Sequence, residues 1–126
     1  MRQGDIEARL SPAIGVYIKD AYPDLHDKPY PVVRCLDGDQ FKAALKVRDG
    51  KTTVRAAYNI PTNALYFRKR PDERHVAHEL EHWAQAQRVG PNVYIEQLQS
   101  ESTFLEYEKS ADDVALTNAP KLVGKY

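Results

Sequence analysis

The amino-acid sequence predicts an α+β fold with an N-terminal helix, a small, mostly antiparallel sheet of about three strands, and two further helices. Apolar residues recur at helical spacing in three segments, and short runs rich in β-branched and aromatic residues lie between the first segment and the other two. With 126 residues, the chain can build one modest core but not two. We therefore expect a single domain over residues 1–126.

The N-terminal helix is expected over residues 5–20. Pro12 interrupts the pattern, because a proline inside a helix lacks the backbone N–H that the helix uses. The apolar side chains nevertheless recur near helical spacing, at Ile6, Leu10, Ile14, Tyr17 and Ile18.

Three short runs are expected to form the sheet. The first strand covers about residues 30–36, the second covers residues 52–59, and the third covers Ala64–Arg68. Residues 48–51 have the composition of a hairpin-like turn before the second strand. The segment 41–47 fits either a helix or a strand, so its structure stays open at this point.

The helix after the sheet carries the most informative motif in the chain. It is expected to begin after Asp72, a residue type that caps helix N-termini. Residues 78–82 read His-Glu-Leu-Glu-His, so His78 and His82 are four residues apart and project from one face, where they can share a metal ion. Glu79 leans toward the same position and could accept a proton from water there.

The apolar residues of this helix favour a metal site over an ordinary solvated face. At about 100° per residue, the apolar side chains gather on one side of the helix and the histidines gather on the other. The apolar side consists of Val76, Leu80, Trp83 and Ala84, and the other side of His75, His78, Glu79 and His82. The alternative is a set of solvated charges that matches the motif by chance.

A third metal ligand is expected on the last helix, because catalytic zinc sites normally have three protein ligands and a water. Residues 101–116 form a helical pattern with carboxylates on a face that is otherwise small and apolar. Glu108 is the preferred ligand, because Asp112 lies one turn further and could accept a hydrogen bond from the other nitrogen of a ligand histidine. Glu101 on the same face is the rival ligand, and a surface ion pair of Glu108 is the alternative.

The two motifs together resemble those of the gluzincin metallopeptidases: His-Glu-Leu-Glu-His at residues 78–82 and Glu-Lys-Ser-Ala-Asp at residues 108–112. The short chain is most similar to the minigluzincins, which are minimal single-domain members, and the likeness covers about residues 50–116. It implies a zinc enzyme that hydrolyses peptide bonds and takes a peptide or protein as substrate. By this resemblance, the zinc ligands would be His78, His82 and Glu108, the general base Glu79, and the carboxylate that orients a ligand Asp112.

The resemblance leaves the substrate-binding features open. No motif identifies a residue that stabilises the oxyanion, and Tyr94, Tyr107 and Tyr126 are the candidates. The strand Ala64–Arg68 could bind an extended peptide along an exposed edge, or it could be an ordinary edge strand. Residues 118–126 form a possible regulatory or flexible tail, which could fold into the cleft and keep the enzyme latent.

Composition excludes several other classes of function. The chain has 18 basic and 18 acidic residues, so its zero net charge argues against a nucleic-acid-binding protein. No apolar stretch is long enough for a membrane span, and no signal peptide is visible, so a cytoplasmic protein is expected. The single cysteine, Cys35, is expected to be a buried core residue. Oligomeric state is not determined by these features.

Two alternatives to an enzyme remain. The same zinc site could belong to a non-catalytic module that binds metal or senses a partner. A third possibility is a helical protein that binds no metal at all.

Overall fold

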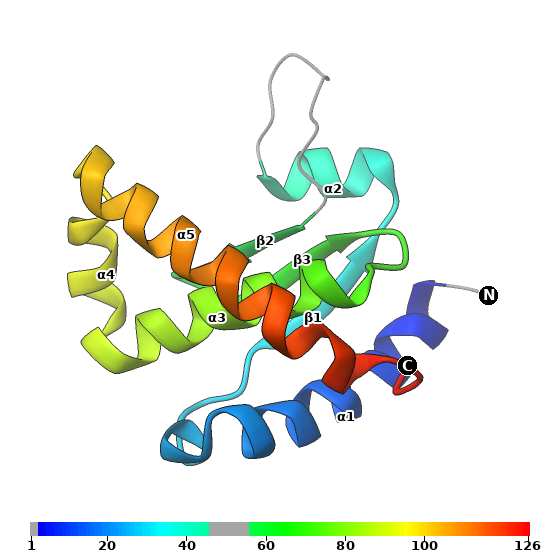
Figure 1. Ribbon diagram of the computed structural model, residues 1–126. Helices are drawn as coiled ribbons and strands as arrows, with labels where there is room; N and C mark the ends of the chain where they lie inside the picture. Colours follow the sequence, from blue (N-terminus) through cyan, green and yellow to red (C-terminus); the bar gives the residue numbers. More distant parts are fainter. Residues whose placement is uncertain (1–2, 46–55) are drawn as a thin grey trace.

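The computed structural model describes residues 3–45 and 56–126, and it confirms the α+β class (Figure 1). The helices and strands are, in chain order, α1 (Gln3–Ala21), β1 (Val32–Leu36), α2 (Gly38–Leu45), β2 (Ala56–Asn59), β3 (Ala64–Arg68), α3 (Glu73–Val89), α4 (Pro91–Gln97) and α5 (Glu101–Asn118). Two short 3₁₀ turns, η1 (Pro23–Leu25) and η2 (Ala119–Leu122), lie between or after them.

The sheet is mixed rather than mostly antiparallel, so this part of the prediction is wrong. Its strand order is β1-β3-β2. β2 and β3 are joined by a tight turn and pair antiparallel, whereas β1 and β3 pair in parallel, with Val32 opposite Ala64. Parallel neighbours need a crossover connection, and the chain between β1 and β3, which includes α2, provides it.

The positions of β2 and β3 also differ from the prediction. β3 is the central strand, with strands on both sides, and its Leu65 and Phe67 are fully buried. Among the described strands, β2 pairs only with β3 and is therefore an edge strand. All four residues of β2 are partly exposed. The predicted edge strand Ala64–Arg68 thus lies inside the sheet, and Ala56–Asn59 takes its place at the edge.

The N-terminal helix α1 extends slightly beyond the predicted range and continues through Pro12. Pro12 has no N–H to donate to the Ala8 carbonyl, four residues earlier in the helix. Because Pro12 and Ala8 are both exposed, water can reach this carbonyl instead. The ambiguous segment is helical in α2 as far as Leu45. Residues 46–47, the predicted turn at 48–51 and the first part of the second strand at 52–55 lie outside the described residues.

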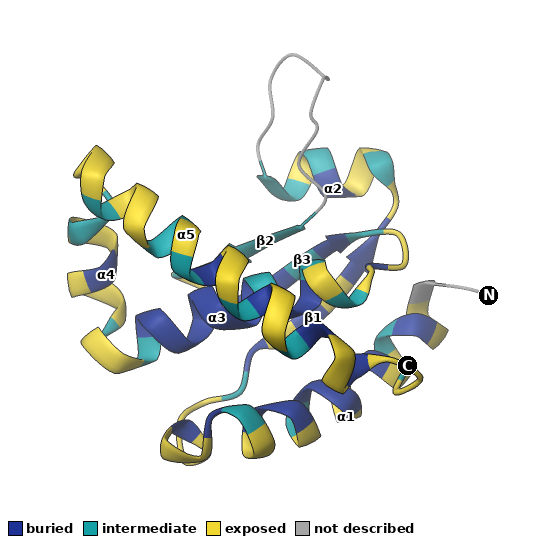
Figure 2. Ribbon diagram, in the orientation of Figure 1, coloured by how far each residue is buried: buried dark blue, intermediate teal, exposed yellow. Residues whose placement is uncertain are grey.

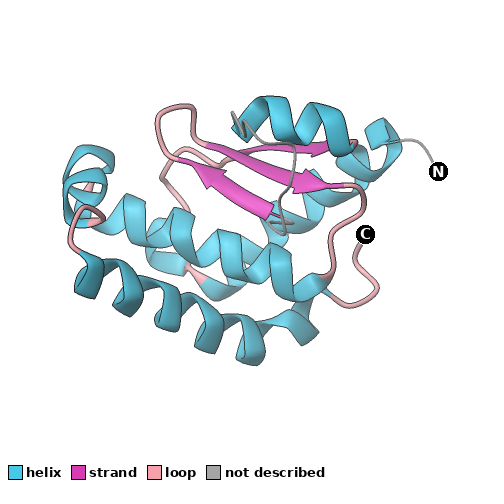
Figure 3. Ribbon diagram, turned by 90° about the horizontal axis from the view of Figure 1, so that it is seen from above, coloured by secondary structure: helices cyan, strands magenta, loops and turns pink. Residues whose placement is uncertain are grey.

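The helix α3 lies at the centre of the fold and is buried along most of its length (Figure 2). It packs against the edge strand β2 and against α4 and α5. Seen from above the sheet, α3 and α5 run side by side (Figure 3). Trp83 anchors the apolar side of α3: its ring makes edge contacts with Tyr22 and Tyr30, and its Nε1 donates to the Pro29 carbonyl at 3.1 Å.

The buried residues of α1, β1, β3 and α3 form one hydrophobic cluster. Cys35 belongs to it with 2% of its surface exposed, which confirms its expected role in the core. Burial raises the pKa of its thiol to about 11, so the neutral form is favoured. Within the described chain, no helix combines the length and apolarity that crossing a bilayer would require.

Candidate metal centre

Capping residues mark both ends of α3, the helix that carries the histidine motif. The Asp72 side chain accepts a hydrogen bond from the His75 backbone N–H at 2.8 Å, which confirms Asp72 as the N-cap. Gly90 follows the last helical residue with a φ of 94°, a conformation that glycine adopts without steric cost. The helix frame therefore fixes the direction in which each side chain of the motif points.

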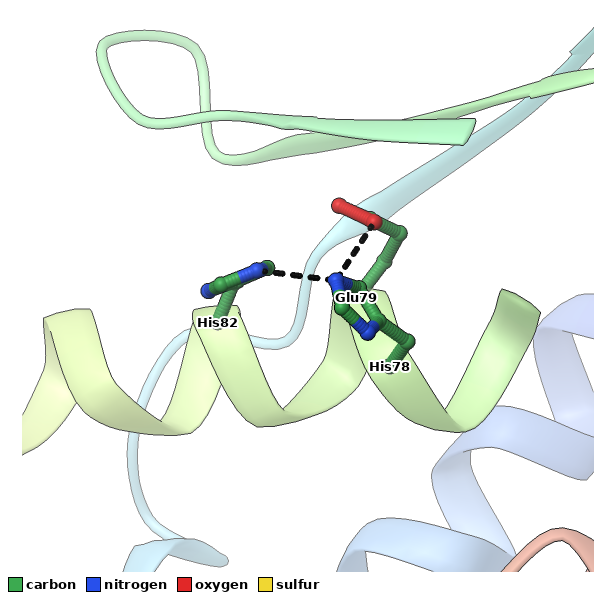
Figure 4. A group of neighbouring side chains, drawn as sticks. All are labelled: His78, Glu79 and His82. Carbon is green, nitrogen blue, oxygen red and sulfur yellow. Dashed lines mark hydrogen bonds and ion pairs between the residues drawn. The ribbon is translucent and has the colours of Figure 1, made fainter. Parts of the chain in front are cut away.

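Three side chains of the motif form a group that could hold a metal ion. His78, Glu79 and His82 project from the same side of α3, beneath the sheet (Figure 4). The Nε2 atoms of the two histidines are 3.1 Å apart, and Nε2 of His78 is 3.8 Å from the Glu79 carboxylate. One possible ligand atom from each residue lies within 4.8 Å of the others. The donor types and their spacing therefore suit a cation, although they do not specify which one.

The structure brings Glu108 to this group from the neighbouring helix α5. Its Oε1 lies 2.9 Å from Nε2 of His82, and its Oε2 lies 3.4 Å from Nε2 of His78. Glu101 is exposed at the first residue of α5, about two turns from Glu108. Of the two carboxylates considered as third ligand, the structure therefore places Glu108 beside the histidines.

Small side chains let α5 approach α3 closely enough for this contact. Ala111 and Ala115 are the buried residues of α5, with 0% and 3% of their surface exposed. They lie three and seven residues after Glu108, so they share its face of the helix. The alternation of carboxylate and alanine on one helical face is thus explained by a close helix contact next to a polar cluster.

Asp112 contacts the other nitrogen of His78. Its Oδ1 is 3.0 Å from Nδ1 of His78, although the Asp112 side chain is largely exposed. A carboxylate at Nδ1 favours the ring form in which this nitrogen carries the proton. The lone pair of His78 is then on Nε2, directed toward His82 and Glu108.

Two residues contact Nδ1 of His82, and neither of them was assigned to this position from the sequence. Nδ1 of His82 lies 3.0 Å from Oε1 of Gln85 and 3.0 Å from the Tyr94 hydroxyl. Gln85 was missed altogether, although its position one turn after His82 puts both on one helical face. Tyr94 was considered only as an oxyanion-stabilising residue.

The three tyrosines considered for that role all have other hydrogen-bond partners. The Tyr94 hydroxyl donates to Gln85 at 2.7 Å, on the Nδ1 side of His82. The Tyr107 hydroxyl donates to Gln97, and the Tyr126 hydroxyl donates to the backbone carbonyl of Pro71 at 2.9 Å. None of these three hydroxyls is therefore directed at the space between the Nε2 atoms.

Burial and neighbouring charges shift the pKa values of the group. Burial raises the pKa of Glu79 to about 7. Burial also lowers the pKa of His78. For His82, burial acts in the same direction, but the hydrogen bond to Glu108 and the nearby carboxylates outweigh it and raise the pKa. That hydrogen bond in turn lowers the pKa of Glu108. The cluster thus combines a paired histidine and carboxylate with a second carboxylate that titrates near neutral pH.

Two cavities of similar size flank the cluster, and both reach Ala56, His78 and Glu79. One, of about 380 Å³, is lined mostly by charged residues and histidines and is here called the polar cavity, whereas the other, of about 360 Å³, is mainly apolar. The remaining lining residues are Asp72, Arg74, His75, Asp112 and Ala115 for the polar cavity, and Ala57, Tyr58, Ile60, His82, Tyr94, Leu98, Phe104 and Glu108 for the apolar one. An extended chain lying across the cluster could therefore place different side chains on its two sides.

The C-terminal segment, residues 118–126, does not line the cavities beside the histidines. Leu122 is buried in the core, and the Tyr126 backbone carbonyl accepts from Arg70 at 2.8 Å. Among the described lining residues of the two cavities, none comes from residues 118–126. The η2 turn in this segment packs against α3, α5 and α1, so the structure does not show the closure of the cleft that was one possibility for the tail.

Comparison of the chain with protein-family models, with curated proteins and with solved structures finds no match.

Proposed function

We propose that the protein is a zinc-dependent metallopeptidase of the gluzincin type, which hydrolyses peptide bonds. The observation that carries this proposal is the convergence of His78, His82 and Glu108 beside the buried carboxylate of Glu79. The resemblance of the motifs at residues 78–82 and 108–112 to those of minigluzincins supports the same conclusion.

The residues of the cluster fit a zinc ion. Two imidazole nitrogens and one carboxylate oxygen are ligands that zinc prefers, and three protein ligands are typical of catalytic sites. Because Asp112 favours the proton on Nδ1 of His78, the lone pair of His78 lies on Nε2, which is 3.1 Å from Nε2 of His82. A cation at this position would take the place of a proton shared between the two rings. His78, His82 and Glu108 would therefore hold the metal.

The proposed mechanism assigns the proton transfers to Glu79. When bound, zinc supplies a Lewis acid that polarises the scissile carbonyl and activates water for attack. Glu79 would accept the proton of the attacking water and deliver it to the leaving amine. Burial, which raises the pKa of Glu79 to about 7 in the metal-free protein, makes this carboxylate a stronger proton acceptor than an exposed one, whereas a bound cation would lower the pKa again.

The edge strand β2 offers a means of binding the substrate. The edge of β2 that pairs with no other described strand can add an extended peptide as a further strand, a common way to hold peptides through main-chain hydrogen bonds. Ala56 at the start of this strand lines both cavities beside Glu79. A peptide paired with β2 would place one side chain in the polar cavity and another in the apolar cavity.

A second function is favoured by one observation. Because the hydroxyls of Tyr94, Tyr107 and Tyr126 have other partners, none of these candidates is available to stabilise an oxyanion. A module that binds zinc without catalysis, and that recognises a partner through the same groove, would need no such residue.

Metal analysis combined with a cleavage assay tests the proposal. Protein purified without chelators should contain one zinc per chain. It should also cleave peptides in an unbiased mixture, and mass spectrometry of the products measures this cleavage. Glu79→Gln should abolish cleavage and keep the zinc, whereas the exposed Glu106→Gln on α5 should change neither. Absence of zinc, or cleavage by Glu79→Gln at the wild-type rate, would refute the proposal. Bound zinc without any cleavage would favour the non-catalytic module.

A further inference from the structure

A buried polar network lies behind His82, on the side away from His78. Gln85 and Tyr94 have 5% and 2% of their surface exposed, and both place an oxygen 3.0 Å from Nδ1 of His82. Buried polar groups are costly unless they are hydrogen-bonded, so the geometry of such a network is narrowly constrained. The network joins three helices, because Gln85 belongs to α3, Tyr94 to α4 and its third member, Tyr107, to α5.

The contact with Tyr107 determines which way the Gln85 amide points. Nε2 of Gln85 lies 3.1 Å from the backbone carbonyl oxygen of Tyr107. A carbonyl oxygen can only accept, so the NH₂ group of the amide must face it. Oε1 of Gln85 therefore faces His82, and it also accepts the Tyr94 hydroxyl proton at 2.7 Å.

This orientation determines what faces the Nδ1 side of the His82 ring. Nδ1 of His82 meets Oε1 of Gln85, which is an acceptor, and the oxygen of Tyr94, whose proton is already donated to Gln85. On this side the ring is therefore expected to donate from Nδ1, which leaves Nε2 to present a lone pair to a cation. While no cation is bound, Oε1 of Glu108 at 2.9 Å and Nε2 of His78 at 3.1 Å compete for the same proton at Nε2 of His82. The same result holds for His78 through Asp112, but there the acceptor is charged and largely exposed, whereas Gln85 is neutral and buried.

The Gln85 amide also links two of the proposed ligands. It contacts the ring of His82 through Oε1 and the backbone of Tyr107 through Nε2, and Tyr107 directly precedes Glu108. One side chain thus constrains both the rotation of His82 and the distance between α3 and α5 where Glu108 projects.

We infer that Gln85, supported by Tyr94, is a positioning residue that holds His82 in the Nδ1–H form and aims its Nε2 at the metal position. The metal part of this inference rests on the proposed function, whereas the part about the ring proton does not.

The ring proton can be tested in metal-free protein that carries His78→Ala and Glu108→Ala, so that neither competitor faces Nε2 of His82. Long-range ¹H–¹⁵N correlation spectra are recorded at a pH where the ring is neutral. With Gln85 intact, His82 should carry its proton on Nδ1. When Gln85→Leu is added, the Tyr94 hydroxyl loses Oε1 as acceptor and can donate to Nδ1, so the proton should move to Nε2. A ring protonated on Nε2 although Gln85 is intact, or a spectrum that Gln85→Leu leaves unchanged, would overturn the inference.

Zinc affinity, measured by competition with a chromophoric chelator, provides the second readout. Gln85→Leu should bind zinc roughly 10- to 100-fold more weakly, the range typical for loss of a group that orients a ligand. Gln85→Glu keeps an acceptor for Nδ1 of His82 but loses the donor to the Tyr107 carbonyl, so its affinity should lie between those of Gln85→Leu and wild type. Gln87→Leu, the same change two residues along α3, is the matched control and should bind as wild type does. Equal affinities of Gln85→Leu and wild type would contradict the inference while leaving the zinc peptidase proposal intact.

The two proposals can fail separately. If the wild-type protein binds no zinc, the peptidase proposal fails, but the ring proton of His82 still tests the role of Gln85. Should Gln85→Leu fail to fold, the spectrum with Gln85 intact decides, together with that of Tyr94→Phe in the same background, which should keep the proton on Nδ1 because Oε1 of Gln85 remains.

Discussion

Glu108 on α5 lies with its Oε1 2.9 Å from Nε2 of His82 on α3. The two residues belong to different helices, and they meet because the alanines of α5 are buried where the two helices pack side by side. The second oxygen of Glu108 is 3.4 Å from His78, so one carboxylate contacts both rings of the motif. This relationship is the structural basis of the proposed zinc site.

Removal of Glu108 should weaken metal binding much more than removal of Glu101. We expect Glu108→Ala to bind zinc at least about 100-fold more weakly, because loss of a direct ligand should exceed the effect of losing an orienting group. Glu101→Ala, the same change at an exposed site on α5, is the matched control and should bind zinc as wild type does. Titration against a chelator measures both. A large loss in Glu101→Ala with none in Glu108→Ala would show that the third ligand is wrongly assigned.

The buried Glu79 should make the metal-free protein less stable as pH rises. Its pKa is about 7 in the folded chain and 4.5 ordinarily, so folding favours the protonated form. The stabilising contribution is therefore fully present below about pH 4.5 and is lost as pH rises through about 7. Relative to Glu79→Gln, the wild-type free energy of unfolding should fall by about 3 kcal/mol over this interval, according to 1.36 kcal/mol per pKa unit.

Urea unfolding of both proteins in chelator, at a series of pH values, measures this difference. The metal must be absent, because a bound cation would itself favour the ionised carboxylate. Parallel pH curves for wild type and Glu79→Gln would contradict the assignment of a raised pKa to Glu79.

The apolar cavity should select the side chain that lies beside the scissile bond. Phe104 lines this cavity, whereas its neighbour Leu105 lines neither cavity and is 56% exposed. Phe104→Ala should lower kcat/KM about tenfold for peptides with a large apolar side chain and should change it little for peptides with a small one. Leu105→Ala is the matched control and should cleave both as wild type does. Equal effects on both classes of peptide would argue against this cavity as a specificity site.

The C-terminal segment should contribute to stability rather than to latency. Leu122 has 1% of its surface exposed, whereas the adjacent Val123 has 63%. Leu122→Ala should lower the free energy of unfolding by about 2 to 5 kcal/mol, and Val123→Ala should change it by less than about 0.5 kcal/mol. Thermal or urea unfolding measures both. A Leu122→Ala protein that is as stable as wild type and cleaves peptides faster would instead support a segment that blocks the site.

The sequence was sufficient for most of the elements, because local signals determine them. The strand Ala64–Arg68 and the N-cap at Asp72 were predicted correctly, since β-strand composition and capping depend on neighbouring residues. Strand order was not predicted, because a strand pattern does not identify its partners. The nearly continuous apolar run Ala-Leu-Tyr-Phe at the start of β3 is, in retrospect, typical of a central strand that pairs on both sides.

The same distinction applies to the candidate site. Helical periodicity fixes the directions of His78, His82, Glu108 and Asp112, so their grouping could be proposed from spacing, with Glu101 left as the rival of Glu108. Gln85 could not be recognised, because its role depends on which nitrogen of His82 faces it. The position of Tyr94 depends on how α4 turns after Gly90, and no local pattern predicts that direction.

A crystal structure of the zinc-loaded protein, with anomalous data collected above and below the zinc edge, tests the central claim most directly. The account predicts one anomalous peak about 2.0 to 2.1 Å from Nε2 of both His78 and His82, and about 2.0 to 2.2 Å from a carboxylate oxygen of Glu108. A peak bound by other residues, or no peak in protein that was saturated with zinc, would contradict it.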